Sequence, residues 1–442
     1  MAEYKRKKVK KRKVSEPTVS KSGHSIPKEE NIKMRSTAPK RNKPLKAAEP
    51  KSKKTSPSKN KVSSSKFKVH QGFKKKHTVK SRIIGIISLL LITVIFITAL
   101  CVPVNIFEAT GNMFASIGST SKYPVSLSGG ITLDVKTNGR LIYILSDTNV
   151  DVFNTSGKLI TSVQHGYENP ALKVSSGRSL IYDIGSKGYT VFNPMGVVNT
   201  NETKKEIICA NISRSGAIAL ATKSDTHASE VQVISKSGSL VYTWYCSSGT
   251  ITNVALSASG KSLAACVLTT DNGAFKSKVN VMTYKSATPV ASQDYDGLIY
   301  SLETVSATKF CVTTERASNY CFFKAKAPVS VNYDYPVSSA HIEYADFVAI
   351  NSRRAGDKSE NNIYLFNKSG KQTAKTVYEG TLTDFHTDGK YIYCLGNSEV
   401  IKLSKKGEIV SRADCGFSAL KVVGAGKSAL VITDNSLYRV NF

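Results

Sequence analysis

The sequence has few of the patterns that carry chemistry. It contains no Gly-rich phosphate loop, no HExxH pair, no GxSxG turn and no EF-hand loop. The four histidines after residue 123 lie far apart and form no ligand pattern: His165, His227, His341 and His386. No two of its 8 cysteines form a CxxC pair, the spacing typical of zinc sites. The motifs therefore predict no enzyme, no metal and no cofactor.

Acidic residues are scarce in the first part of the chain. Residues 1–82 contain 28 Lys and Arg against 5 Asp and Glu, and they are rich in Ser, Thr and Pro. Such a segment cannot bury enough apolar surface to offset the entropy of ordering. We expect residues 1–81 to form a disordered basic tail.

Charge is absent altogether from the next segment, Ile83 to Phe107. About 20 apolar residues suffice for a helix to cross a bilayer, so we expect a transmembrane helix over residues 82–104. Residues 64–82 carry seven Lys and Arg and no acid, which predicts a cytoplasmic N-terminus and an extracytoplasmic C-terminal part. A cleaved signal peptide is disfavoured because its charged region would be too long. The expected protein is a single-pass signal-anchor protein of the cell membrane.

The basic tail has two candidate partners. The lysines beside the span are expected to contact anionic lipids of the inner leaflet: Lys74, Lys75, Lys76, Lys80 and Arg82. The cluster from Lys5 to Lys13 suggests an acidic or nucleic-acid partner as the alternative, bound through charge without sequence preference.

Residues after 123 show no amphipathic helical pattern and instead repeat about every 40 residues. Each copy has a turn, an apolar strand, a polar turn and a second strand rich in Val, Ile, Tyr and Thr. The copies begin at or near Gly139, Gly177, Gly216, Gly260, Thr308, Asp346, Gly389 and Gly426.

A repeat of this length with about four strands is typical of a β-propeller blade. We therefore predict an all-β, eight-bladed propeller over residues 123–442, after a linker over 105–122. Merging the Thr308 copy with a neighbour would leave seven blades. The last copy lacks an outer strand and Tyr123–Leu127 lacks a blade, so this segment is expected to complete the last blade.

The turns GKYIY at Gly389 and FNTSGK at Phe153 carry a resemblance. With the basic tail and the span, they resemble an uncharacterised family of membrane-anchored propellers from Gram-positive clostridia. The fold is similar to the eight-bladed quinoprotein-like and outer-membrane-assembly propellers. Quinoproteins repeat a tryptophan in their blades, whereas this chain has only Trp244, which argues against a quinone cofactor.

The connections of such a propeller fall on two faces, and one face is expected to carry the longer loops, such as 222–229, 269–277 and 351–361. Connections between blades on this face pair tyrosine with acid, a composition typical of recognition surfaces. The candidate ligand face is Tyr167, Glu168, Asp294, Tyr295, Asp296, Asp334, Tyr335, Tyr378 and Glu379. The alternative is that these tyrosines pack between blades.

The expected function is a non-enzymatic binding or assembly scaffold of the cell envelope, with an envelope protein or glycan as partner. Two alternatives remain open: an envelope enzyme acting on polysaccharide or peptide in the propeller channel, and a transmembrane connector between an acidic cytoplasmic partner and an external ligand. A disulfide between Cys311 and Cys321 across one hairpin is a further expectation to test.

Overall fold

The computed structural model describes residues 87–90, 93, 111–115, 117–119, 122–128, 130–139, 141–342, 347–367 and 369–442. Residues 87–90, 93 and 111–115 are helical. The expected tail, with its five candidate lipid-contacting residues, and most of the expected span lie outside these ranges. Within them, no helix combines the length and the hydropathy that a membrane crossing requires.

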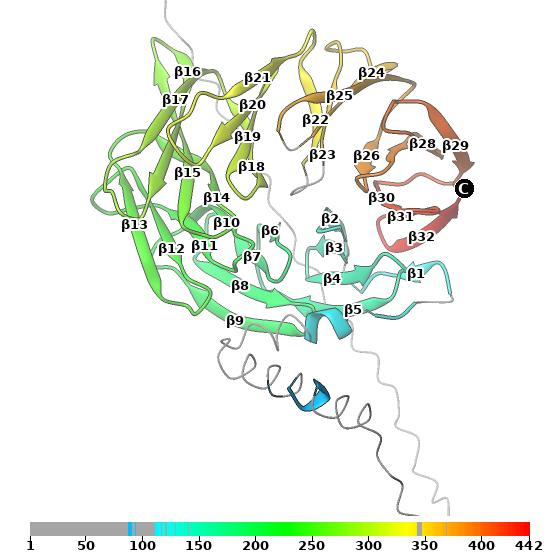
Figure 1. The fold of residues 1–442 in the computed structure, drawn as a ribbon, viewed down its shortest axis with the longest axis horizontal. Helices are drawn as coiled ribbons and strands as arrows, with labels where there is room; N and C mark the ends of the chain where they lie inside the picture. The colour runs from blue at the N-terminus through cyan, green and yellow to red at the C-terminus, as the bar shows by residue number, and fades with distance from the viewer. Residues whose placement is uncertain are drawn as a thin grey trace, which may run out of the picture. The chain divides into compact units, whose positions relative to one another are not determined.

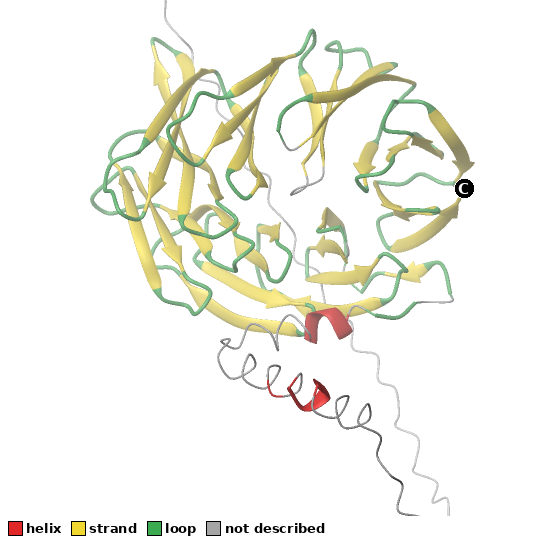
Figure 2. Ribbon diagram, viewed as in Figure 1, coloured by secondary structure: helices red, strands yellow, loops and turns green. Residues whose placement is uncertain are grey.

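The described residues after 123 form eight antiparallel sheets of four strands each, arranged as blades around a ring (Figures 1 and 2). Blade 1 contains β2 (Thr132–Thr137), β3 (Leu141–Ser146), β4 (Asn149–Asn154) and β5 (Leu159–Gln164). Blade 2 contains β6 (Pro170–Val174), β7 (Ser179–Asp183), β8 (Gly188–Asn193) and β9 (Gly196–Glu202). Blade 3 contains β10 (Ile207–Ile212), β11 (Ile218–Thr222), β12 (Ser229–Ile234) and β13 (Leu240–Cys246). Blade 4 contains β14 (Thr250–Leu256), β15 (Ser262–Asp271), β16 (Ala274–Thr283) and β17 (Ala291–Asp296).

The second half of the ring follows the same order. Blade 5 contains β18 (Ile299–Ser306), β19 (Lys309–Thr314), β20 (Ala317–Phe322) and β21 (Val329–Asn332). Blade 6 contains β22 (Val337–Ile342), β23 (Phe347–Ser352), β24 (Glu360–Asn367) and β25 (Gln372–Glu379). Blade 7 contains β26 (Asp384–Thr387), β27 (Ile392–Leu395), β28 (Glu399–Leu403) and β29 (Ile409–Asp414). Blade 8 contains β30 (Lys421–Ala425), β31 (Ser428–Ile432), β32 (Ser436–Asn441) and β1 (Val125–Ser126). The eight-bladed prediction is confirmed, and the Thr308 copy is a blade of its own.

Blade 8 joins the two ends of the propeller sequence. Strand β1 pairs with β32 so that Val125 lies opposite Leu437 and Ser126 opposite Ser436. The Leu127 amide donates to the Asn435 carbonyl at 2.9 Å. The expected ring closure is therefore confirmed, and it removes an exposed strand edge.

The two faces of the ring carry different connections. We call the face with the connections between first and second, and between third and fourth, strands of each blade the linker face. The other is the loop face. The expectation of a long loop at 269–277 is wrong, because β15 and β16 continue through it and turn only at Asn272 and Gly273. Both turn residues have positive φ, 49° and 81°, as a two-residue hairpin turn requires.

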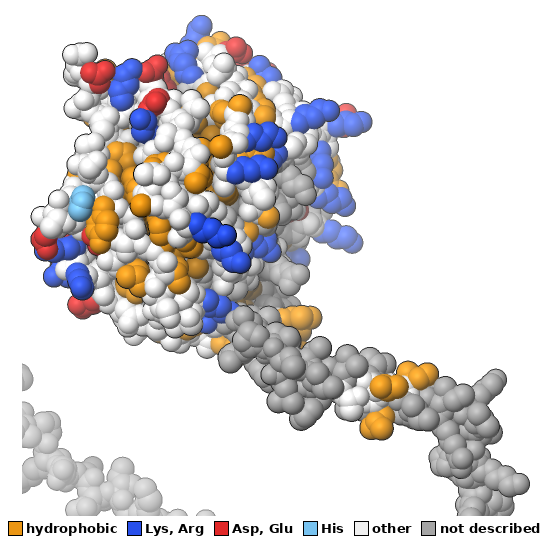
Figure 3. Space-filling model, turned by 60° about the vertical axis from the view of Figure 1, so that its left-hand side comes forward, with side chains coloured by type: hydrophobic (Ala, Val, Ile, Leu, Met, Phe, Trp, Pro, Cys, Tyr) orange, Lys and Arg blue, Asp and Glu red, His pale blue; other side chains and the backbone are white. Residues whose placement is uncertain are grey.

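The segment before the propeller contacts the linker face. The Asn112 side chain donates to the Gly177 carbonyl at 3.1 Å. Asn154 donates to the carbonyl of Gly118 at 2.7 Å, and Lys158 to that of Ile117 at 2.8 Å. All three propeller residues stand in or beside linker-face connections, and in Figure 1 helix 111–115 lies in front of β5 and β9. This contact distinguishes the two faces, and Figure 3 shows Lys and Arg side chains projecting along one side of the ring.

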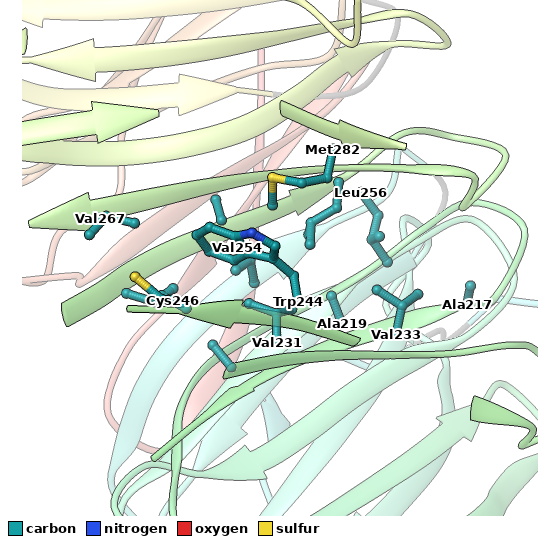
Figure 4. Close-up of a cluster of buried hydrophobic side chains, with 14 residues drawn as sticks. Ala217, Ala219, Val231, Val233, Trp244, Cys246, Val254, Leu256, Val267 and Met282 are labelled. Carbon is teal, nitrogen blue, oxygen red and sulfur yellow. The ribbon is translucent and has the colours of Figure 1, made fainter. Parts of the chain in front are cut away.

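The hydrophobic core consists of eight clusters, one at each junction between neighbouring blades. At the junction of blades 3 and 4, Trp244 packs with Val254, Leu256 and Met282 (Figure 4). The second strands are apolar on both faces because both faces meet a blade: in β15, Leu263 belongs to one cluster and Ala264 to the next. Burial on both faces explains the continuous apolar runs in the sequence.

The expected disulfide is absent because Cys311 and Cys321 point to opposite sides of blade 5. Cys311 lies opposite Tyr320 in the β19–β20 ladder, while Cys321 lies opposite Phe310. Cys311 packs between blades 5 and 6, and Cys321 between blades 4 and 5. All seven cysteines of the described residues are free.

Candidate functional site: an acidic hollow and the axial ion pairs

The predicted ligand-face residues lie at four blade junctions rather than in one site. Tyr167 and Glu168 follow β5, and Asp334 and Tyr335 follow β21, as expected for connections between blades. The other five are within strands: Asp294, Tyr295 and Asp296 end β17, and Tyr378 and Glu379 end β25. Their placement in inter-blade loops was therefore wrong, although all of them lie at the loop-face end of their blades.

Three of the four tyrosines pack into the protein. Tyr378 is buried between blades 6 and 7. Tyr295 packs between blades 4 and 5, with its hydroxyl 3.3 Å from the Cys321 sulfur. The Tyr167 hydroxyl lies 2.7 Å from the Thr190 hydroxyl of the next blade. Burial raises the pKa of Tyr378 to about 12, and the pKa values of Tyr167 and Tyr295 are also raised chiefly by burial.

The carboxylates beside these tyrosines face solvent and pair with lysines. Asp294 lies 3.4 Å from Lys278, and Asp296 pairs with Lys276 on the same strand. Asp334 lies 3.8 Å from Lys375. Exposed pairs of this kind contribute little to stability, roughly 0–1 kcal/mol. Their lysine partners would compete with any cationic ligand.

One hollow on the loop face collects several polar groups. It has a volume of about 530 Å³ and is lined by three segments, Tyr378–Thr381, Asn397–Glu399 and Arg412–Asp414. These come from the end of β25, the β27–β28 connection and the end of β29. Gly396 is required beside it, because a Cβ atom there would lie 2.5 Å from the Tyr378 hydroxyl.

The charges of this hollow are mainly negative. Glu379, Glu399 and Asp414 line it together with a single cation, Arg412, which lies 3.3 Å from Glu399. Glu379 and Asp414 are exposed. In the described part of the chain, no group of three or more His, Cys, Asp or Glu residues is close enough to hold a metal ion. The arrangement suits a cationic group such as a Lys or Arg side chain of a partner.

A second polar group lies around the axis of the ring. Lys173 of β6 reaches Glu303 of β18 with Nζ 2.7 Å from Oε1, although blades 2 and 5 are not neighbours. Cys209 of β10 lies nearby: burial raises its pKa to about 12, while the charge of Lys173 acts in the opposite direction. Lys173 therefore has a partner and is not a free nucleophile.

The inner strands of blades 6 to 8 carry a further cluster. Asp384 lies 3.3 Å from Lys421, and burial raises its pKa against the opposing effect of this lysine. The rings of His341 and His386 are 4.5 Å apart. The Gly424 amide donates to His386 Nδ1 at 3.1 Å. Each inner-strand carboxylate of these two axial groups is thus neutralised by a lysine, as in a structural ion pair.

Sequence reasoning found Tyr378 and Glu379 of the hollow but not Glu399, Arg412 and Asp414. It also missed the axial pairs. These residues belong to no motif, and their partners come from other strands or other blades. A repeat-by-repeat comparison of strand ends would have selected Glu399 and Asp414, which occupy the loop-face ends of β28 and β29.

The chain belongs to the family of unknown function DUF5711, whose model matches residues 130–442. A comparison with curated proteins gives no match. The recognised family type, an uncharacterised propeller family, is thereby confirmed. The clostridial origin and the membrane anchor stay predictions.

Solved structures similar to this chain include three propellers. The C-terminal WD40 domain of Sif2 has a TM-score of 0.51 at 12% identity, covering 74% of this chain and 99% of its own. Sqt1 of Saccharomyces cerevisiae has a TM-score of 0.51 at 11% identity, covering 74% and 100%. BamB from Moraxella catarrhalis has a TM-score of 0.43 at 15% identity, covering 73% and 98%. At such identities the likeness shows the fold alone.

Proposed function

We propose, for this DUF5711 protein, a membrane-tethered scaffold that presents the loop face of its propeller to a partner in the cell envelope. The observation that carries the proposal is the contact of residues 112, 117 and 118 with the linker face. The uncharged run from Ile83 to Phe107 directly precedes them. If this run spans the membrane, the linker face is turned toward the bilayer and the loop face away from it.

The acidic hollow is the proposed contact point. Glu379, Glu399 and Asp414 outnumber Arg412, and the hollow lies on the face that the linker leaves free. A shallow, polar hollow beside a rigid buried tyrosine suits a protein partner offering a basic side chain. The ion pairing of the axial carboxylates gives no comparable support to the envelope-enzyme alternative, and the connector alternative concerns the tail.

The tether is tested by labelling single added cysteines in intact cells with a membrane-impermeant maleimide. Ser398→Cys, in the exposed β27–β28 connection, is expected to react from outside. Ser20→Cys, in the basic tail, is expected to react only after the cells are permeabilised. Equal labelling of the two positions in intact cells would defeat the proposed topology.

The contact point is tested with a photo-crosslinking residue at Thr381, which lines the hollow, and a control at Lys285 on the linker face. A discrete crosslinked protein is expected at Thr381 only. The yield should fall severalfold in Glu379→Gln/Asp414→Asn. It should stay unchanged in Asp434→Asn, which alters a loop-face carboxylate of blade 8. Loss in the control variant as well would show that overall charge, not the hollow, governs the contact.

A further inference from the structure

Positive charge is concentrated on the linker face. Every blade contributes at least one described Lys or Arg to this face, and exposed examples from blades 4 to 8 are Lys285, Lys324, Lys371, Lys406 and Lys427. Among the described residues of these connections the carboxylates are Asp388 and Glu408. Asp388 already accepts a hydrogen bond from the Tyr393 hydroxyl at 2.7 Å.

The loop face has no such excess. Its connections mix lysines such as Lys187, Lys204 and Lys223 with acids such as Asp225 and Glu206. The Lys205–Asp225 ion pair is one result of this mixing. The propeller is therefore electrostatically polarised, with its basic side on the linker face.

Exposed apolar side chains surround the basic residues. The outer strands begin at the linker face, and five of them begin with an exposed aliphatic residue at their first or second position: Leu159, Val197, Leu240, Val329 and Ile409. Leu240 is 58% exposed and Ile409 is 55% exposed. In Figure 3, hydrophobic side chains stand between the projecting Lys and Arg side chains.

The linker adds apolar groups to the same face. Met113 and Phe114, in the short helix whose Asn112 contacts blade 2, are 58% and 70% exposed. Met195, in a linker-face connection of blade 2, is 63% exposed. Lysines mixed with exposed aliphatic and aromatic side chains are the composition of surfaces that lie in the headgroup region of a bilayer.

We infer that the linker face docks on a membrane surface that carries anionic headgroups, so that the propeller rests on the bilayer. Each lysine near an anionic surface contributes about 1 kcal/mol, and the aliphatic rim adds apolar burial. The docking builds on the proposed tether, which brings this face to the bilayer. It goes beyond the tether because a flexible linker alone would let the propeller turn freely.

The single tryptophan, Trp244, permits a direct test with full-length protein in vesicles. Leu240 and Tyr245 are exposed residues at opposite ends of β13, about 17 Å apart for five strand residues. Leu240→Trp places an indole at the linker face, and Tyr245→Trp places one toward the loop face. The vesicles contain brominated phosphatidylcholine, which quenches indole on contact, with or without phosphatidylglycerol.

The expected result is severalfold stronger quenching of Leu240→Trp than of Tyr245→Trp, only with phosphatidylglycerol, and weakened by salt. Adding Glu at Lys285, Lys324, Lys371 and Lys406 should abolish the difference. The matched control puts Glu at Lys187, Lys204, Lys223 and Lys358, four exposed lysines of the loop face, and should preserve it.

Flotation of the vesicles separates the two proposals. Protein that floats with both lipid mixtures but shows equal quenching at the two positions retains the tether and overturns the docking. Protein that floats with neither mixture overturns both. Release of the quenching by soluble polyphosphate, with none of the lysine dependence in vesicles, would make the face a site for an anionic polymer and also overturn the docking on lipid.

Discussion

Lys173 of β6 and Glu303 of β18 form an ion pair across the axis of the propeller, with 2.7 Å between Nζ and Oε1. Their side chains keep 28% and 35% of their exposure. Burial lowers the pKa of Lys173 and the Glu303 carboxylate raises it, and the net shift is upward. The pair links blades 2 and 5, so it stabilises the closed ring rather than one blade.

This pair predicts a measurable coupling. Lys173→Met and Glu303→Leu are each expected to lower the free energy of unfolding, while the double variant loses less than the sum, with a coupling of about 1 kcal/mol for a partly exposed pair. Because the pKa of Lys173 is raised in the folded state, the stabilisation is complete below about pH 10 and is lost as the pH rises further. Urea unfolding of the four proteins at pH 7 and above pH 10 measures both effects. Additive losses would show that the two residues act independently.

The closing strand predicts a strict difference between neighbouring residues. Val125 packs into the cluster between blades 8 and 1, whereas Ser126 is exposed. Val125→Asp should lower the free energy of unfolding by about 2 kcal/mol or more, because it places a charge against apolar side chains. Ser126→Asp introduces the same charge with little effect. Equal melting temperatures for the two variants would contradict the stabilising role of β1.

Tyr378 and Glu379 predict a separation of stability from binding. Tyr378→Ala removes a buried aromatic ring between blades 6 and 7 and should cost about 3–5 kcal/mol. Glu379→Ala, on the exposed neighbour, should leave the melting temperature unchanged. Thermal unfolding followed by circular dichroism distinguishes them. A stable Tyr378→Ala variant would return this tyrosine to the list of ligand contacts.

His386 predicts weaker folding in mild acid. Burial lowers its pKa well below the usual value, and His341 adds to this effect. The unfolded chain therefore takes up a proton near pH 6.5 that the folded protein refuses, so stability falls as the pH drops below that value, by up to about 1.4 kcal/mol per unit. His386→Gln should flatten the slope. A residual slope is expected from His165, whose pKa burial also lowers. An unchanged slope in His386→Gln would exclude His386 as its source.

The sequence by itself determined the features that arise within one blade. Turn glycines, apolar second strands and the repeat of about 40 residues are local patterns, and each survives in a single copy. The leftover strand at Val125 and the missing strand after Asn441 also predicted ring closure, because unpaired edges are disfavoured.

Only the tertiary structure decided which side chains meet. Tyr295 lies opposite Ser277 and points into a blade junction, while its neighbours Asp294 and Asp296 alternate outward to Lys278 and Lys276. The sequence placed all three on one surface because side-chain direction depends on strand register. Likewise, Lys173 and Glu303 lie far apart in the sequence, and only a closed ring of blades brings them to the axis, since no local pattern encodes a contact between blades that are not neighbours.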